Sequence, residues 1–245
     1  MYNALKQKVK TLIPEKFLFK NELFFRYVHG TFYRGNKHQC NICNKKLSAF
    51  IILKNKDLLC PFCGSISRTR RLWRILNENK SIQGQVLHFS PSRSLFRKLK
   101  SNSAITYFSS DFENEFLADY HFDITNINQP NETFDLIICY HILEHIIDDV
   151  KAIKELYRVL KPKGLAYIQT PFKTGEIYED YSITSPELRK KYFGQDDHVR
   201  IYSVKGLCKR LVNTGFKVTI KSFETDENDF YNGFKSPETI IQITK

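Results

Sequence analysis

Four cysteines in two closely spaced pairs give the strongest chemical signal in this sequence. Cys40 and Cys43 form one Cys-x-x-Cys pair, and Cys60 and Cys63 form a second pair sixteen residues later, followed by Gly64. Two such pairs at this separation place four thiolates around one tetrahedral zinc ion. With four Cys ligands no coordination position stays open, so we expect this zinc to be structural and not catalytic. Reduced cysteines without a metal are the alternative.

A second group of reactive side chains follows a short apolar run, Phe134–Cys139. Tyr140, His141, Glu144 and His145 come directly after it. A histidine base suits chemistry at neutral pH, so His145 and His141 are candidate catalytic residues. The simpler interpretation is a helix start at which Glu144 favours the positive end of the helix dipole.

A third group lies in a long connection, residues 171–202, that separates two expected elements. Asp197 and His198 stand there between Gly194 and Arg200. A connection of this length in a compact domain is usually a lid or a substrate loop. We therefore expect Asp197 and His198 to act as acid and base, with a surface turn held by local ion pairs as the alternative.

The elements around these groups alternate between strand and helix. The run Phe134–Cys139 is too short for a helix and predicts a strand buried on both faces. A helix follows, ended by Pro162 and Gly164, and Leu165–Gln169 is the next strand. Strand, helix and strand with short links indicate a parallel, doubly wound sheet, whose ligands bind beyond the carboxyl ends of the strands. The apolar positions that predict the helix are Ile146, Ile147, Val150, Ile153, Tyr157 and Leu160.

The remaining pattern completes an α/β fold with seven strands. A helix is expected over residues 203–214, ended by Gly215. The last two strands are joined by a loop, so the final strand should be antiparallel. The further expected strands are residues 86–89, 105–108, 120–125, 216–222 and 239–244.

Four of these pieces together resemble the class I S-adenosylmethionine-dependent methyltransferases. They are Phe134-Asp135, His141–His145, Arg158–Gly164 and Gly215-Phe216, and the resemblance covers residues 85–245. It implies a Rossmann-like methyltransferase sheet that uses S-adenosylmethionine. The cysteine ribbon with CPFCGSISRTR, and FGQDDHVRIY late in the chain, are similar to a bacterial subgroup of zinc-ribbon methyltransferases with no assigned substrate.

The resemblance also implies a set of cofactor-binding residues. Asp111, at the end of the second strand, matches the acidic residue that binds the ribose hydroxyls, which suits a carboxylate with two acceptor oxygens. Asp123, with Ile124, matches the position that meets the adenine. Tyr140 ends the fourth strand beside the expected cofactor site.

The turn after the first strand differs from the usual family pattern. The family has an acidic residue and a Gly-x-Gly turn there, whereas this chain has His88, Ser90 and Ser92 and no glycine between Gly84 and Gly164. We expect the small serines to cradle the cofactor with their hydroxyls. In ubiquinone-pathway O-methyltransferases a similar Glu-His segment holds a divalent cation, which the His141–His145 segment could do here.

Charge divides the chain unevenly. Residues 1–100 carry a net charge of +17, since 21 Lys and Arg stand against 4 Asp and Glu, and the remaining residues carry −5. Such a basic part meets nucleic acid, anionic lipid or a phosphorylated substrate, unless the excess is only solvated surface. We expect a basic segment over residues 1–35, a zinc ribbon with an Arg-rich helix over 36–80, and the methyltransferase domain over 81–245.

Two basic stretches in this part each have two interpretations. Leu5, Val9 and Leu12 form one helical stripe that either packs on its own domain or lies on a membrane surface. The arginines of residues 68–74 either bind phosphates or form salt bridges to the acidic part of the chain, residues 101–245. These arginines are Arg68, Arg70, Arg71 and Arg74.

The totals fit an enzyme made and kept in the cytoplasm. No apolar run approaches the roughly 20 residues that span a bilayer, and the basic start lacks the apolar region of a signal peptide. We expect a methyltransferase that acts on an oxygen or nitrogen of a small-molecule or sugar-type acceptor. An RNA methyltransferase that uses the basic ribbon, and a non-catalytic zinc-ribbon protein with a degenerate methyltransferase domain, are the alternatives.

Overall fold

The computed structural model describes residues 21–113 and 115–245, which divide into two compact units. The N-terminal unit holds the described residues up to Asn79 together with Ser92–Lys98 and Glu224–Ser236. The sheet unit holds Lys80–Pro91, Leu99–Phe223 and Pro237–Lys245. The stripe predicted at Leu5, Val9 and Leu12 lies outside the described residues. No helix of the described ranges is long and apolar enough to cross a membrane.

The N-terminal unit is built from short elements around a small core. Strands β1 and β2 pair antiparallel, as do β3 and β4. Leu47, Phe50 and Phe62 pack with two of the cysteines, and this core is too small to hold the unit together by apolar burial alone. The elements are α3 (Glu22–Thr31), β1 (Arg34–Gln39), β2 (Lys46–Leu47), β3 (Ile51–Ile52), β4 (Leu58–Leu59), α4 (Ser67–Glu78) and α9 (Glu227–Asn232).

The sheet unit contains a six-stranded sheet in the order β11-β12-β8-β7-β5-β6. The four strands from β6 to β8 are parallel, and β12 runs antiparallel to both β8 and β11. This confirms the Rossmann-like α/β fold with an antiparallel last strand. The strands are β5 (Gly84–Phe89), β6 (Ile105–Ser110), β7 (Phe134–Tyr140), β8 (Leu160–Gln169), β11 (Lys217–Phe223) and β12 (Glu238–Thr244).

The prediction of a seventh strand over residues 120–125 is wrong. In this segment the pairing consists of isolated bridges, a parallel one from Tyr120 to Ser110 and an antiparallel one from Asp123 to Asn126. The Ser110 hydroxyl accepts the N–H of Phe122 at 2.8 Å, and a carboxylate oxygen of Asp123 accepts the N–H of Thr125 at 2.8 Å. Because side chains take the donors that a ladder would use, the segment forms no continuous strand.

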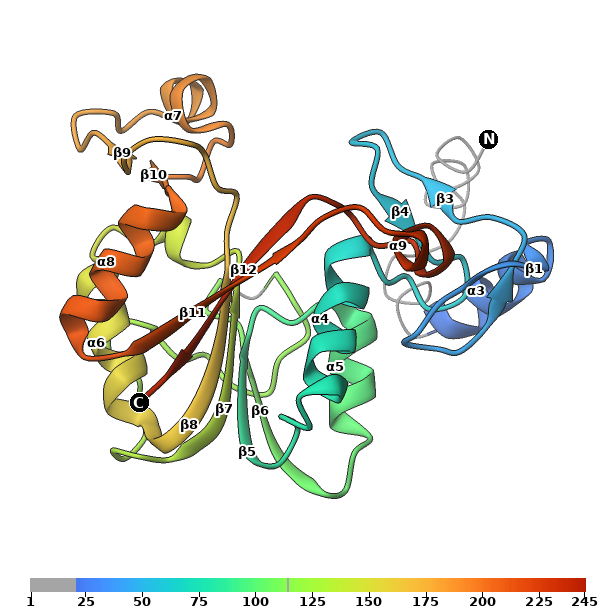
Figure 1. Cartoon of the computed structure of the whole chain (residues 1–245), viewed down its shortest axis with the longest axis horizontal. Helices are drawn as coiled ribbons and strands as arrows, with labels where there is room; N and C mark the ends of the chain where they lie inside the picture. The colour runs from blue at the N-terminus through green and yellow to red at the C-terminus, as the bar shows by residue number, and fades with distance from the viewer. Residues whose placement is uncertain (1–20, 114) are drawn as a thin grey trace. The chain divides into compact units, whose positions relative to one another are not determined.

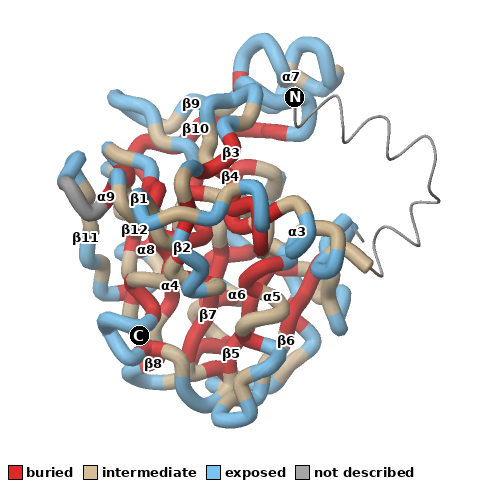
Figure 2. Tube along the Cα trace, turned by 90° about the vertical axis from the view of Figure 1, so that its right-hand side faces the viewer, coloured by how far each residue is buried: buried red, intermediate tan, exposed pale blue. Residues whose placement is uncertain are grey.

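Helices α6 (Asp149–Val159) and α8 (Val204–Thr214) cover one face of the sheet (Figure 1). Ile153 and Leu156 of α6 and Leu207 and Leu211 of α8 pack in one core with the strands. Strands β5 and β7 are buried along most of their length, which explains the continuous apolar run of β7 (Figure 2). The parallel strands therefore end in a fixed, packed edge on which a site can be built.

The boundaries of α6 differ from the predicted ones. The helix begins at Asp149 because the Asp148 carboxylate caps it by accepting the N–H of Lys151 at 2.9 Å. The residues before it form the short 3-10 helix η1 (Leu143–His145). The helix ends at Val159, and Pro162 and Gly164 lie inside β8, where the pairing with β7 is irregular. The shorter helix leaves the chemically interesting residues in the connection from β7 to α6.

The long connection after β8 carries three small elements. They are β9 (Tyr178–Glu179), α7 (Pro186–Phe193) and β10 (Arg200–Ile201), and β9 pairs antiparallel with β10. The Ser185 side chain caps α7, and Gly194 ends it with a φ of 95°. The turn that follows α7 contains Asp197 and His198. Among the described residues, the one helix not yet named is α5 (Arg93–Lys100).

Candidate active site and metal centre

The four cysteine sulfurs of the N-terminal unit converge. Cys40 Sγ lies 3.6 Å from Cys63 Sγ, and Cys43 Sγ lies 3.7 Å from Cys60 Sγ. A tetrahedron with metal–sulfur bonds of about 2.3 Å has edges of about 3.8 Å, so the sulfurs have the spacing of zinc ligands. The residue after each pair has a positive φ and donates its N–H to the first cysteine of that pair. The donor set fits one zinc ion.

Arg70 is fully buried near these cysteines. It donates to the carbonyl of Ser65 at 2.7 Å, and the Ser65 hydroxyl lies 3.3 Å from both Cys40 Sγ and Cys63 Sγ. A zinc ion with four thiolates has a net charge of −2, so a buried guanidinium at this place is electrostatically favourable. Arg70 therefore belongs to the support of the cysteine cluster and is not available to grip a phosphate.

Arg71 forms a buried salt bridge within the same unit. Its Nη2 lies 2.8 Å from Asp229 Oδ1, and the two side chains are 1% and 4% exposed. It also donates to the Ser236 hydroxyl at 2.8 Å. Asp229 comes from the acidic second part of the sequence, so for Arg71 the structure supports the salt-bridge alternative over the phosphate alternative.

Ser90 and Asp111 meet at the carboxyl ends of β5 and β6. The Ser90 hydroxyl donates to Asp111 Oδ1 at 2.7 Å, and the Ser90 N–H donates to the carbonyl of Ser110 at 2.7 Å. Ser90 has a φ of 43°, in the left-handed region that favours glycine. Asp111 is buried, and its Oδ2 accepts the N–H groups of Glu115 and Phe116. Ser90 therefore adopts a left-handed conformation at the turn where the sequence resemblance implies glycine.

The other predicted cofactor residues have varied surroundings. Asp123 Oδ1 accepts from the backbone and hydroxyl of Thr125, both at 2.8 Å, and Ile124 is buried in the core of the sheet unit. His88 is buried in β5 with its Nδ1 3.1 Å from the Tyr107 hydroxyl, so it has an internal partner. Ser92 belongs to the N-terminal unit, where its carbonyl accepts from the first turn of α5.

Three polar atoms are buried at the carboxyl ends of β7 and β8. The Tyr140 hydroxyl, Gln169 Oε1 and the Thr170 hydroxyl have no hydrogen-bond partner among the described residues. Burial raises the pKa of the Tyr140 phenol well above its ordinary value, so it stays neutral. Buried polar atoms without partners are costly unless a ligand or water meets them.

The structure brings together the two groups of candidate catalytic residues that the sequence separates. Ligand atoms of Glu144, His145 and His198 all lie within 4.8 Å of one another, and the two imidazole centroids are 4.7 Å apart. His145 Nδ1 lies 3.0 Å from Asp197 Oδ2, and His141 Nδ1 lies 3.1 Å from Glu144 Oε1. Every predicted catalytic residue is therefore part of one cluster.

The backbone around this cluster is itself unusual. His141 has a φ of 55°, and its N–H donates to the carbonyl of Gln169 at 2.8 Å. A residue other than glycine in this conformation costs about 1–3 kcal/mol and is concentrated at functional sites. Burial raises the pKa of the Glu144 carboxyl, but the hydrogen bond and charge of His141 outweigh this effect, and its pKa is lowered overall.

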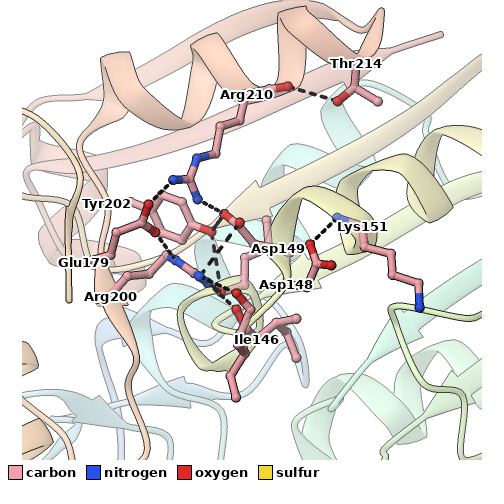
Figure 3. A network of polar contacts seen from close by, with 11 residues as sticks. Ile146, Asp148, Asp149, Lys151, Glu179, Arg200, Tyr202, Arg210 and Thr214 are labelled. Atoms are coloured by element: carbon pink, nitrogen blue, oxygen red, sulfur yellow. Dashed lines mark hydrogen bonds and ion pairs between the residues drawn. The ribbon is translucent and has the colours of Figure 1, made fainter. Parts of the chain in front are cut away.

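Arg200 ties the long connection to the segment that carries Glu144 and His145. It is fully buried and donates to the carbonyls of Leu143 at 3.1 Å and Ile147 at 2.7 Å, and also to that of Ile146 (Figure 3). Its Nε donates to a carboxylate oxygen of Glu179 at 2.9 Å. Because Arg200 stands two residues after His198, these bonds fix His198 against η1.

A charged network supports Arg200 from the other side. Arg210 pairs with both Asp149 and Glu179, and the Tyr202 hydroxyl donates to Asp149 (Figure 3). Sequence reasoning missed the roles of Asp149, Glu179 and Arg210. The sequence offered a hint for Asp149 alone, as a charged residue in the first turn of an apolar helix. Asp149, Glu179 and Arg210 lie too far apart in sequence to be paired without coordinates.

The fold and the cluster define a class of protein: a Rossmann-like α/β domain with a polar site beyond the carboxyl ends of its parallel strands. Residues 67–220, more than half of the chain, match the model of a family described as "Methyltransferase domain". The chain therefore belongs to this methyltransferase domain family. The expectation of an S-adenosylmethionine-dependent methyltransferase is confirmed at the level of the family.

Individual relatives are distant. An uncharacterized protein of Methanocaldococcus jannaschii is 33% identical over 33% of this chain and 37% of its own length. The sterol 24-C-methyltransferase of Eremothecium gossypii is 27% identical over 54% of this chain and 32% of its own length. This chain thus spans about a third of the length of each.

Among solved structures, an S-adenosylmethionine-dependent methyltransferase from Archaeoglobus fulgidus has a similar fold. The TM-score is 0.53 with 17% identical residues, over 74% of this chain and 95% of that chain. At this identity the similarity shows the fold alone.

Proposed function

We propose that this protein transfers the methyl group of S-adenosylmethionine to an oxygen or nitrogen of a small-molecule or sugar-type acceptor. In this reaction the bond between the sulfonium sulfur and the methyl carbon breaks as the acceptor bonds to that carbon. S-adenosylhomocysteine leaves, and the acceptor loses its proton. The observation that supports this proposal best is the cluster of Glu144, His145 and His198 at the carboxyl edge of the sheet that also carries Asp111.

The cofactor would be held by residues that follow the parallel strands. Ser90 and Asp111 fit this role because Ser90 holds the left-handed turn after β5, and Asp111 Oδ1, which accepts from the Ser90 hydroxyl, retains a second lone pair for a ribose hydroxyl. Asp123, Ile124 and Tyr140 would complete the adenosine side. When bound, the cofactor supplies an activated methyl group, and the protein aligns the acceptor and excludes water.

The acceptor would lie near the histidine cluster. His145, held by Asp197, and His198 are placed to handle the acceptor's proton, with His141 next to Glu144. The buried hydroxyls and amide of Tyr140, Gln169 and Thr170 favour a polar, hydroxyl-bearing molecule.

Calorimetric titration with S-adenosylmethionine tests the proposal. We expect one cofactor per chain for the natural protein and markedly weaker binding for Asp111→Asn, because the amide has fewer acceptor lone pairs than the carboxylate and no negative charge. Asp180→Asn, which changes an exposed turn, is the matched control and should bind normally. Circular dichroism of each variant checks that it is folded. A natural protein that gives no heat of binding would indicate the degenerate, non-catalytic alternative.

We further propose that the four cysteines hold a structural zinc ion, because their spacing and the adjacent Arg70 suit a dianionic zinc tetrathiolate.

An RNA acceptor is the second candidate, because the N-terminal unit carries several exposed lysines. They are Lys45, Lys46, Lys54 and Lys56. Retention on polynucleotide that falls steeply with salt would support RNA, whereas retention indifferent to salt would count against it.

A further inference from the structure

Glu144, His145 and His198 are chemically a metal-ligand set as well as a group of titratable side chains. Their ligand atoms lie within 4.8 Å of one another. Two histidines and one carboxylate form a mixed nitrogen and oxygen donor set, which suits transition-metal cations better than Mg²⁺ or Ca²⁺. Three protein ligands leave further coordination positions open.

Both imidazoles are oriented by a second partner in the way that ligating histidines are. His145 Nδ1 lies 3.0 Å from Asp197 Oδ2, and His198 Nδ1 lies 3.2 Å from the carbonyl of Phe193. Each Nδ1–H can therefore donate outward, which leaves Nε2 with its lone pair for a metal. His198 Nε2 is buried and has no hydrogen-bond partner among the described residues. A buried lone pair of this kind points to a ligand.

The carboxylate of the set has one side-chain partner, His141, whose Nδ1 lies 3.1 Å from Glu144 Oε1. Glu144 is 1% exposed, and its Oε2 lacks a hydrogen-bond partner within the described ranges. The helix-start interpretation does not account for it, because η1 is only three residues long and has no dipole comparable with that of a full helix. Buried carboxylates are stable when they are paired or coordinate a metal.

We propose that Glu144, His145 and His198 bind one divalent transition-metal cation, with Asp197 as a positioning residue for His145. The inference deepens the proposed function and rests on it for the chemistry, with the cation in place of the two histidines as the group that activates the acceptor. A cation with open positions would bind the acceptor through oxygen and lower the pKa of its hydroxyl, whose proton leaves to solvent. The resulting oxyanion bonds to the methyl carbon as the bond from carbon to sulfur breaks. The acceptor atom is accordingly oxygen and not nitrogen.

Titration of the full, zinc-loaded protein with MnCl₂ tests the site directly. Thiolates prefer Zn²⁺ to Mn²⁺, so the cysteine cluster does not compete for the added ion. Calorimetry and electron paramagnetic resonance should report one Mn²⁺ per chain. His145→Ala, at a half-exposed position, and His198→Ala should each bind at least about tenfold more weakly, and Asp197→Asn should show a smaller loss. His121→Ala, which removes an exposed histidine of the same unit, should bind as the natural protein does.

The outcomes separate this inference from the proposed function. Bound Mn²⁺ that disappears in folded His145→Ala supports the site, whether or not S-adenosylmethionine binds in its own titration. No Mn²⁺ binding, or binding unchanged in both histidine variants, overturns the site even if the cofactor binds. Circular dichroism of each variant identifies any that fails to fold, and His145→Ala then decides the result because its side chain is the less buried of the two.

Discussion

Acidification should destabilise this protein through His88. Burial lowers the pKa of His88 to about 3, against an ordinary value of about 6.5. The unfolded chain takes up a proton at this residue as the pH falls through about 6.5, while the folded chain does not until about pH 3. The contribution of the buried, neutral His88 to the free energy of unfolding is therefore complete above about pH 6.5 and is lost progressively below it. Between about pH 7 and pH 5 the loss is about 2 kcal/mol.

Urea unfolding of the natural protein and of His88→Gln, each at about pH 7 and about pH 5, measures this contribution. Glutamine keeps a polar partner for the Tyr107 hydroxyl but has no proton to gain. The free energy of unfolding of the variant should fall by about 2 kcal/mol less on acidification than that of the natural protein. His121→Ala should keep the full fall, because His88 is unchanged in that variant. An equal fall in the natural protein and His88→Gln would refute the burial argument.

Two further predictions concern the N-terminal unit. Cys43→Ser, or a chelator that removes the proposed zinc ion, should unfold this unit, since its apolar core is small. Circular dichroism with metal analysis would show the loss, and Cys208→Ser, in α8, is the control. A zinc-free chain with an unchanged thermal transition would contradict this prediction. Arg71→Met should lower the free energy of unfolding by about 3–5 kcal/mol because it leaves the buried Asp229 carboxylate unpaired. Urea unfolding should show a smaller cost for the double variant Arg71→Met/Asp229→Leu, and equal costs would argue against the pairing.

Much of the fold follows from local patterns. The strand β7 could be predicted because it is buried on both faces and so reads as an unbroken apolar run. The sequence at residues 120–125 also predicts a strand, but the Ser110 hydroxyl takes the N–H of Phe122, and no periodicity reveals such a bond. The start of α6 depended in the same way on the capping carboxylate of Asp148.

The candidate site, like the fold, could be predicted from the sequence only in part. The Glu144-His145 pair could be located because the carboxyl end of a parallel strand is where such sheets bind ligands. That His198 joins this pair could not be predicted, because it depends on Arg200, which bonds to the carbonyls of Leu143 and Ile147. Sequence spacing does not reveal a hydrogen bond between a side chain and backbone carbonyls that lie so far away along the chain.

The glycine-free turn shows how a departure from a family pattern can preserve the local structure. A left-handed conformation costs a residue with a side chain roughly 1–2 kcal/mol. At Ser90 the hydroxyl donates to a carboxylate of Asp111, and hydrogen bonds to charged groups contribute about 1.5–3 kcal/mol, enough to offset that cost. The hydroxyl thus adds a side-chain bond between the end of β5 and the end of β6 that a glycine cannot make. The lack of glycine is therefore no argument that the chain has lost its methyl donor.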